Sequence, residues 1–127
     1  MARRVFISYQ HKDRHAKELL KAQAENKRMD LSLNDQSPSK PFSSSWKSRM
    51  KNRIENSSAT VVMIGKDTYK SKAVNWEIEQ SRKQGNKIIG VQIHRGQHHR
   101  LPSAMREREE LKSWKIDTLS SRLRRRK

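Results

Sequence analysis

Two polar segments of the sequence contain the side chains best suited to chemistry. Residues 8–13 place a hydroxyl group, an imidazole and charged groups directly after an apolar run, and residues 65–79 include the glutamates Glu77 and Glu79. On a helix these two carboxylates lie about 100° to either side of Ile78, so only one of them can face a cleft if Ile78 faces a sheet. Geometry alone does not choose between them. The alternative for the first segment is helix capping or a surface role, and for either glutamate it is a solvated helix charge that balances nearby Lys and Arg.

Other kinds of reactive site find little support in the sequence. The histidines His94, His98 and His99 share one loop, but that loop has no acidic partner and lacks the spacing of a zinc site, so we expect no metal. The absence of cysteine excludes disulfides, thiol nucleophiles and Cys-ligated metals. The sequence also lacks a phosphate-loop motif, a dinucleotide-binding fingerprint and a serine nucleophile elbow, so three common enzyme classes lose support.

The charge of the chain favours anionic partners. Its 127 residues include 30 Lys plus Arg against 13 Asp plus Glu, for a formal net charge of +17. Such a surface attracts phosphates, so nucleic acid is not excluded as a partner, although no aromatic residues for base stacking interrupt the basic run at 122–127. Leu123 is the only apolar residue of that run. We therefore expect a single domain over residues 1–121 and a frayed basic tail over residues 122–127.

The composition indicates a cytoplasmic protein with a small core. Hydrophobic residues make up 31% of the chain and the mean hydropathy is −1.14. No apolar run approaches the roughly 20 residues that span a bilayer, and the first residues lead into a strand without the apolar region of a signal peptide. We therefore expect no membrane partner.

Strand-like and helix-like segments alternate along most of the chain. Runs of β-branched and aromatic residues predict strands at 4–9, 29–33, 59–65 and 87–93. Helical periodicity predicts intervening helices whose buried positions are Ala16, Leu19, Leu20 and Ala24, then Trp46, Met50 and Ile54, then Val74, Ile78 and Ser81. A long Ser/Pro-rich loop is expected at 34–45. After a loop at 94–102 we expect a helical turn or two at 105–112, an edge strand at 114–117 and a basic terminal helix.

This order of elements predicts an α/β fold. A flavodoxin-like three-layer sandwich fits best, with a central parallel sheet of about five strands in the order 2-1-3-4-5. The topological switch point then lies between the first and third strands. A ligand is therefore expected beside the residues that follow Tyr9 and Ile64, where the two polar segments meet.

The same segments resemble the Toll/interleukin-1 receptor (TIR)-like family, most closely its short bacterial members of the Thoeris antiphage type. The resemblance covers about residues 3–93. It rests on the opening strand Arg4–Tyr9, the strand at Ser57–Gly65, and Ser71–Ile78 leading to Gly85–Val91. The family's fold is the flavodoxin-like fold that the order of elements predicts.

The resemblance also distinguishes the two glutamates. The family's catalytic glutamate opens the helix after strand three, eight residues before a glycine that leads into strand four. Glu77 has that spacing to Gly85, whereas Glu79 does not. Ala73 stands where the family usually has a tryptophan, which leaves space in the wall of the cleft.

The resemblance implies an enzyme that cleaves the nicotinamide–ribose bond of NAD, with NAD as substrate and no cofactor. Its product would be a cyclic ADP-ribose-type signal that a downstream effector senses in antiphage defence. Self-association is implied through the loop 34–45, which matches the family's BB loop. The alternative is a non-catalytic TIR interaction module that assembles through this loop. With Glu77 as the catalytic residue, the expected cleft residues are Ser8, Tyr9, His11, Asp35, Ser37 and Lys66.

Overall fold

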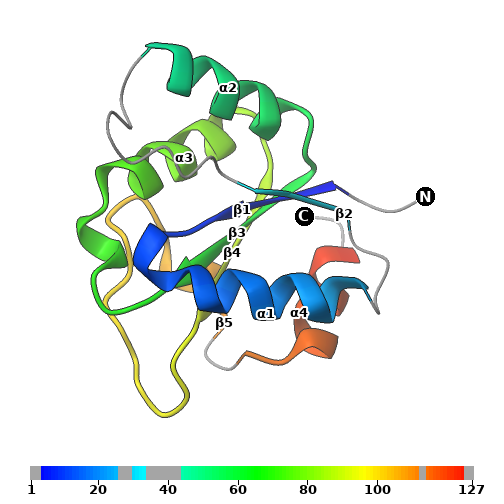
Figure 1. Ribbon diagram of the computed structural model, residues 1–127, viewed down its shortest axis with the longest axis vertical. Helices are drawn as coiled ribbons and strands as arrows, with labels where there is room; N and C mark the ends of the chain where they lie inside the picture. Colours follow the sequence, from blue (N-terminus) through cyan, green and yellow to red (C-terminus); the bar gives the residue numbers. More distant parts are fainter. Residues whose placement is uncertain (1–3, 26–29, 34–43, 112–113, 125–127) are drawn as a thin grey trace.

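Five parallel strands form the centre of the computed structural model, which describes residues 4–25, 30–33, 44–111 and 114–124 (Figure 1). They lie in the order β2-β1-β3-β4-β5. The predicted flavodoxin-like fold and strand order are therefore confirmed. The strands are β1 (Arg4–Ser8), β2 (Asp30–Leu33), β3 (Ala59–Ile64), β4 (Lys87–Gln92) and β5 (Glu110–Leu111).

The middle of the sheet is β3, whose six residues are all buried. Its apolar sequence suits a strand that is covered on both faces. β3 pairs with β1 on one side and with β4 on the other, so that Val62 lies opposite both Ser8 and Gly90. Because these strands are parallel, their carboxyl ends meet at one edge of the sheet, and the segments after Ser8 and Ile64 are neighbours there.

Helices cover both faces of the sheet. Figure 1 shows α1 (Arg14–Glu25) and α4 (Ile116–Arg124) on one side, with α2 (Ser44–Glu55) and α3 (Lys72–Lys83) on the other. Side chains of a strand alternate between the two faces. In β1, Val5 and Ile7 pack into the core beneath α1 and α4, whereas Phe6 packs against α2. Ser8 therefore faces the side of α2 and α3.

The buried stripe predicted for α2 is confirmed. Trp46, Met50 and Ile54 are buried against Phe6 of β1. The helix begins at Ser44, two residues earlier than expected, so the end of the predicted 34–45 loop belongs to the helix. Residues 34–43 lie outside the described part of the chain.

The prediction for α1 is right at Ala16 and Leu20 and wrong at Leu19, which is 51% exposed. A short 3-10 turn, η1 (His11–Asp13), precedes this helix, and both Asp13 and Lys17 are buried as well. The buried stripe is therefore rotated toward these two polar residues. Leu19 lies roughly 110° from its centre, at about 100° per residue. The side chain of Ala24 lies outside the described residues.

Both ends of α3 are marked by residues suited to helix termini, of which the glycine at the carboxyl end was expected from the sequence. The Ser71 side chain accepts a hydrogen bond of 3.1 Å from the backbone N–H of Val74 and so caps the first turn. Gly85 follows the helix with a φ of 76°, a left-handed conformation that favours glycine. The inner face of the helix buries Val74, Ile78 and Ser81, as predicted, and also Glu77.

The last third of the chain differs from the prediction. A 3-10 turn, η3 (Glu107–Glu109), replaces the expected helical turns, and the edge strand is β5, not residues 114–117. Leu111 determines the position of this strand, because it is buried in the core beside β4. The following α4 begins at Ile116, inside the segment for which a strand was expected.

The expectation that Leu123 cannot anchor the basic run is wrong. Leu123 is 5% exposed and packs into the same core cluster as Leu119 and Leu20. The Nζ atom of Lys87 also donates a hydrogen bond to the carbonyl oxygen of Arg122. The expected boundary between residues 121 and 122 therefore falls inside α4, which continues to Arg124.

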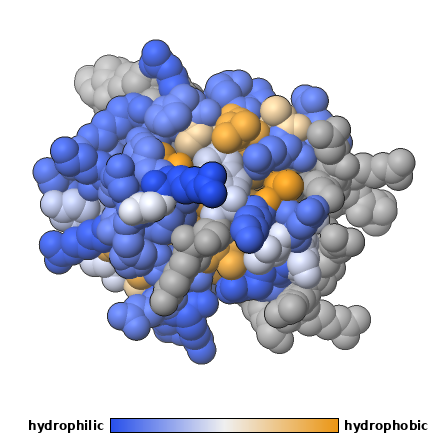
Figure 2. Space-filling view, turned by 90° about the horizontal axis from the view of Figure 1, so that it is seen from below, coloured by the Kyte–Doolittle hydropathy of each residue, from blue (hydrophilic) through white to orange (hydrophobic). Residues whose placement is uncertain are grey.

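The face of the molecule seen from below Figure 1 is mainly hydrophilic. In Figure 2, hydrophilic side chains cover most of the described part of this face, and the hydrophobic patches on it are small. Within the described ranges, no helix combines the length and hydrophobicity needed to cross a membrane.

Candidate functional site

The centre of the candidate site is a buried contact between β1 and α3. The Ser8 hydroxyl donates a hydrogen bond of 2.5 Å to Oε1 of Glu77, although the two residues lie 69 positions apart in the chain. Both residues are 0% exposed. Ser8 is the last residue of β1, so this contact lies at the carboxyl edge of the sheet, where the fold predicts a ligand site.

The two candidate carboxylates point in different directions. Glu77 is directed inward from α3, while Glu79 is exposed on the outer side of the same helix. This is the arrangement expected when Ile78, which is also buried, packs toward the sheet. The glutamate that faces inward is thus Glu77, which is also the one whose spacing to Gly85 matches the family pattern.

The backbone of Glu77 is also held by a hydroxyl group, which is linked in turn to the sheet. The Ser81 hydroxyl donates a hydrogen bond of 2.8 Å to the carbonyl oxygen of Glu77, and it lies 2.6 Å from Oγ1 of Thr60 on β3. All three residues are 0% exposed. α3 is therefore joined to the sheet by buried polar contacts at the level of the candidate carboxylate, within an otherwise apolar interface.

Aromatic residues form the wall between α2 and α3. The rings of Trp46 and Trp76 are tilted by 47° with their centroids 5.3 Å apart. Ala73 and Trp76 are partly buried against the cluster that contains Trp46 and Phe6. Position 73, where the resemblance leads one to expect a tryptophan, is alanine, and the tryptophan of this segment is Trp76, beside Glu77.

A second buried carboxylate, Asp13, lies at the same edge of the sheet, and sequence analysis did not single it out. It is 4% exposed and accepts a 3.3 Å hydrogen bond from the Thr68 hydroxyl. That hydroxyl also accepts a 2.8 Å hydrogen bond from the backbone N–H of Gly65. A Cβ atom at Gly65 would lie 2.4 Å from Oδ2 of Asp13. Only glycine at position 65 leaves room for Asp13, so Gly65 is the sequence feature that could have indicated this close approach.

Cations surround this junction. Lys12 forms an ion pair with Asp67, and the hydrogen bond from Lys12 is the main reason why the pKa of the Asp67 carboxyl is lowered. Lys66, an expected cleft residue, is exposed just beyond the end of β3. The edge therefore presents ammonium groups to solvent near the buried Asp13.

The other expected cleft residues are not all brought together. Tyr9 is buried on the opposite face of the sheet from Ser8, in the core with Ala16, and the ammonium group of Lys17 lies 5.8 Å from the centroid of its ring. His11 begins η1, but its side chain lies outside the described part of the structure. Asp35 and Ser37 fall within residues 34–43, which are also outside it.

The histidine loop has contacts that sequence reasoning missed. Nδ1 of His94 and Nε2 of His99 lie 2.7 Å apart, and the His15 ring on α1 lies 6.2 Å from the His94 ring between centroids. Burial, followed by the charge of His94, lowers the pKa of His99. His98 pairs with Glu110 at 2.7 Å, so the expectation that these histidines have no acidic partner is wrong. Among the described residues, no three potential ligands are arranged to hold a metal ion.

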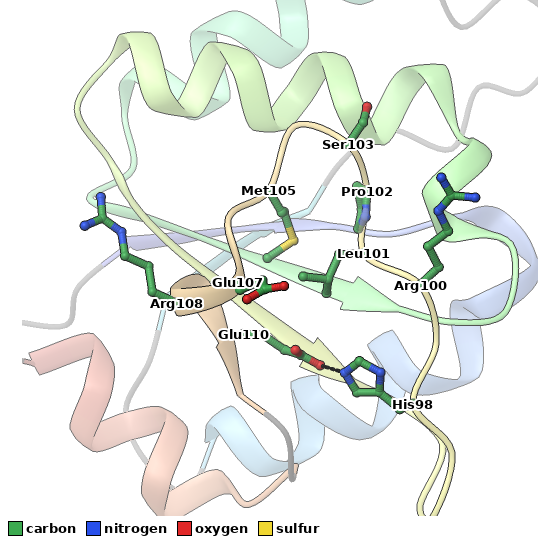
Figure 3. Close-up of a pocket in the computed structure, with 9 residues that line it drawn as sticks. All are labelled: His98, Arg100, Leu101, Pro102, Ser103, Met105, Glu107, Arg108 and Glu110. Atoms are coloured by element: carbon green, nitrogen blue, oxygen red, sulfur yellow. Dashed lines mark ion pairs between the residues drawn. The ribbon is translucent and has the colours of Figure 1, made fainter.

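A cavity of about 840 Å³ is lined partly by residues of this loop (Figure 3). Figure 3 shows Arg100 and Arg108 on opposite sides, with Leu101 and Met105 between them. Glu77 does not line this cavity, so this cavity and the candidate carboxylate are separate features. The lining residues are His98, Arg100, Leu101, Pro102, Ser103, Met105, Glu107, Arg108 and Glu110.

A known family matches most of the chain. The family described as "Thoeris protein ThsB, TIR-like domain" matches residues 6–98 of the chain. This range includes the Ser8–Glu77 contact, Asp13 and the turn at Gly65. None of the curated proteins compared with the chain matches it significantly.

Solved structures show a similar fold. The chain is similar to the TIR domain of the Toll-related receptor TRR-2 from Hydra magnipapillata, with a TM-score of 0.59 and 22% identity, covering 78% of this chain and 74% of that one. A prokaryotic SEFIR domain gives a TM-score of 0.62 and 18% identity, covering 98% and 94%. The TIR domains of the activated Roq1 resistosome, which recognises the effector XopQ, give 0.52 and 21%, covering 71% and 57%. At these identities the likeness concerns the fold.

Proposed function

The chain belongs to the Thoeris ThsB family of TIR-like domains, and on this basis we propose that it cleaves the bond between nicotinamide and ribose in NAD, with Glu77 as the catalytic carboxylate. The observation that carries this proposal is the inward-facing Glu77 at the carboxyl end of β1, where its carboxylate accepts the Ser8 hydrogen bond. NAD is the substrate, and the reaction requires no cofactor.

The proposed chemistry suits a site with one carboxylate. Nicotinamide is a cationic leaving group, so it takes the electron pair of the broken bond and departs neutral without a general acid. The ribose then carries oxocarbenium character, and a carboxylate that contacts the ribose hydroxyls stabilises this positive charge. Glu77 supplies that negative charge in our proposal.

The attacking atom determines the product. Attack by water gives ADP-ribose and releases a proton to solvent, whereas attack by an atom of the adenosine half gives a cyclic product. We propose the cyclic ADP-ribose-type product, released in the cytoplasm and sensed by a downstream effector in antiphage defence. Support for this outcome comes from the Thoeris family to which the chain belongs.

The burial of Glu77 gives the reaction a structural requirement. A residue that is 0% exposed contacts NAD only after the structure around it opens. Association of protomers could stabilise such an open form, and the Roq1 TIR domains belong to an activated resistosome. We therefore propose self-association through the loop 34–45, of which residues 34–43 lie outside the described part of the chain.

The same burial favours the alternative of a non-catalytic interaction module, in which Glu77 has a purely structural role. Incubating the protein with NAD at several protein concentrations, and separating the products by mass, discriminates the two. Release of nicotinamide with a cyclic product supports the complete proposal, and ADP-ribose alone supports the bond cleavage without the cyclisation. No nicotinamide at any concentration would favour the interaction module.

A further inference from the structure

The position of Ser8 is unusual for a polar side chain. The three residues of β1 that precede it, Val5, Phe6 and Ile7, are all apolar and at most 1% exposed. Ser8 is equally buried, at 0% exposure. A buried hydroxyl without a hydrogen-bond partner destabilises a protein, so packing alone favours an apolar residue at this position. The acceptor that satisfies the Ser8 hydroxyl is Oε1 of Glu77.

We propose that Ser8 is a positioning residue, whose hydroxyl fixes the orientation of the Glu77 carboxylate for the reaction. This inference rests on the proposed function for its catalytic part. The contact itself is independent of that function, because the 2.5 Å distance and the complete burial of both groups are properties of the fold.

The geometry supports orientation as the role. The terminal torsion of a glutamate side chain has broad minima, so an unrestrained carboxylate rotates readily. A hydroxyl has a single proton, and that of Ser8 is directed to one oxygen of Glu77. Hydrogen bonds to a charged acceptor are also stronger than those between neutral groups. The Ser8 bond therefore limits the rotation of the carboxylate plane.

Ser8 is also well placed to act as a fixed reference point. It lies within the paired part of the sheet, in register with Val62 of β3. Groups carried by paired strands are held more accurately than groups on loops. The backbone of Glu77 is held separately, through the Ser81 hydroxyl. Side chain and backbone of Glu77 thus have different anchors, and the two can be tested separately.

The first test uses an isosteric pair of substitutions. Ser8→Thr and Ser8→Val both add one methyl group to the serine side chain and have nearly the same shape. They differ because threonine keeps the hydroxyl, whereas valine has a second methyl group in its place. Misplacing a reacting group by about 1 Å can reduce a rate roughly a hundredfold, so we expect Ser8→Val to lower kcat by about tenfold or more with little change in KM. Ser8→Thr should restore most of kcat, and Ser8→Ala serves if the larger side chains prevent folding.

Ser57→Ala is the control for Ser8→Ala, because it also removes a buried hydroxyl contact, with the carbonyl oxygen of Arg53, but lies outside the contacts that hold Glu77. We expect it to lower the melting temperature while leaving kcat nearly unchanged. Equal losses of kcat in Ser8→Ala and Ser57→Ala, or in Ser8→Val and Ser8→Thr, would overturn the inference.

A second test does not depend on turnover. Ser8→Val is introduced into the wild-type protein and into the Glu77→Gln variant, and the loss in melting temperature is measured in each. If the hydroxyl acts on the charged carboxylate, the loss is larger in the wild-type background. Equal losses in both would refute the action of the hydroxyl on a charged carboxylate, because glutamine also offers Ser8 an acceptor. If the wild type releases no nicotinamide but the losses differ, the proposed function fails while the positioning of Glu77 by Ser8 stands.

Discussion

Substitution of Leu123 by alanine should destabilise the fold markedly, although the basic sequence around it suggests a frayed end. Leu123 is 5% exposed and packs with Leu119 on α4 and Leu20 on α1. Replacing a buried leucine by alanine typically costs about 2–5 kcal/mol, which combines lost burial with the cavity that remains. Because Leu123 lies in the last turn of a terminal helix, its surroundings can relax, and we expect about 2–3 kcal/mol.

That free energy corresponds to a measurable shift. For a domain of this size, about 1 kcal/mol lowers the melting temperature by roughly 3–6 °C, so Leu123→Ala should melt about 10 °C lower than the wild type. Leu19→Ala is the matched control, because Leu19 also lies on a helix but is 51% exposed. Leucine and alanine have similar helix propensities, so the control isolates burial, and it should change stability by less than about 0.5 kcal/mol.

Thermal and urea denaturation followed by circular dichroism measure both variants. Equal melting temperatures for Leu123→Ala and Leu19→Ala would refute the packing of α4 against α1. That result would restore the expectation of a frayed segment from residue 122 onward.

Further predictions concern the carboxyl edge of the sheet and the assembly. Gly65→Ala should destabilise the protein by about 1–3 kcal/mol, because its Cβ would lie 2.4 Å from Oδ2 of Asp13; unchanged urea denaturation would contradict that close approach. Because burial and His94 lower the pKa of His99 from its ordinary 6.5, the unfolded chain binds a proton at this residue more readily than the folded chain, and stability should fall as the pH falls through 6.5. His99→Asn should weaken this pH dependence of stability. An identical pH dependence in the wild type and the variant would refute the role of His99. If association opens the site, the specific activity on NAD should rise with protein concentration, whereas a constant value across a wide dilution series would indicate a self-sufficient monomer.

The features that the sequence predicted are those with a strong local pattern. Trp46, Met50 and Ile54 recur at helical spacing, and all three are buried as expected. The apolar runs of β1, β3 and β4 required a sheet covered on both faces, and the right-handed connection rule left few strand orders. The strand order then placed Ser8 at the edge where a ligand is expected.

The features that the sequence did not predict depend on contacts between distant segments. Periodicity favoured Leu19 for the core, but the buried positions of Asp13 and Lys17 rotate the inner face of α1 away from it. Leu123 is the only apolar residue of a basic run, yet it packs against leucines from other segments of the chain. The contact between His94 and His99 requires the loop conformation, which their spacing alone does not specify.

Glu77 lies between these two cases. Helical geometry showed that only one of Glu77 and Glu79 could face inward if Ile78 faces the sheet, but it did not select one of them. In the structure Ile78 packs into the core, Glu77 is buried and Glu79 is exposed. Sequence patterns could not reveal the Ser8 contact, because it joins residues that are 69 positions apart.

The most direct test of the central claim is the rate of nicotinamide release from NAD by the wild type, Glu77→Gln and Glu79→Gln, measured at equal concentration after the folding of each has been checked by circular dichroism. Glutamine keeps the size of Glu77 and an acceptor for Ser8 but removes the negative charge. We predict release by the wild type and by Glu79→Gln, with a loss of about a hundredfold or more in Glu77→Gln. Activity retained in a folded Glu77→Gln variant, or lost only in Glu79→Gln, would contradict the assignment of Glu77 as the catalytic carboxylate.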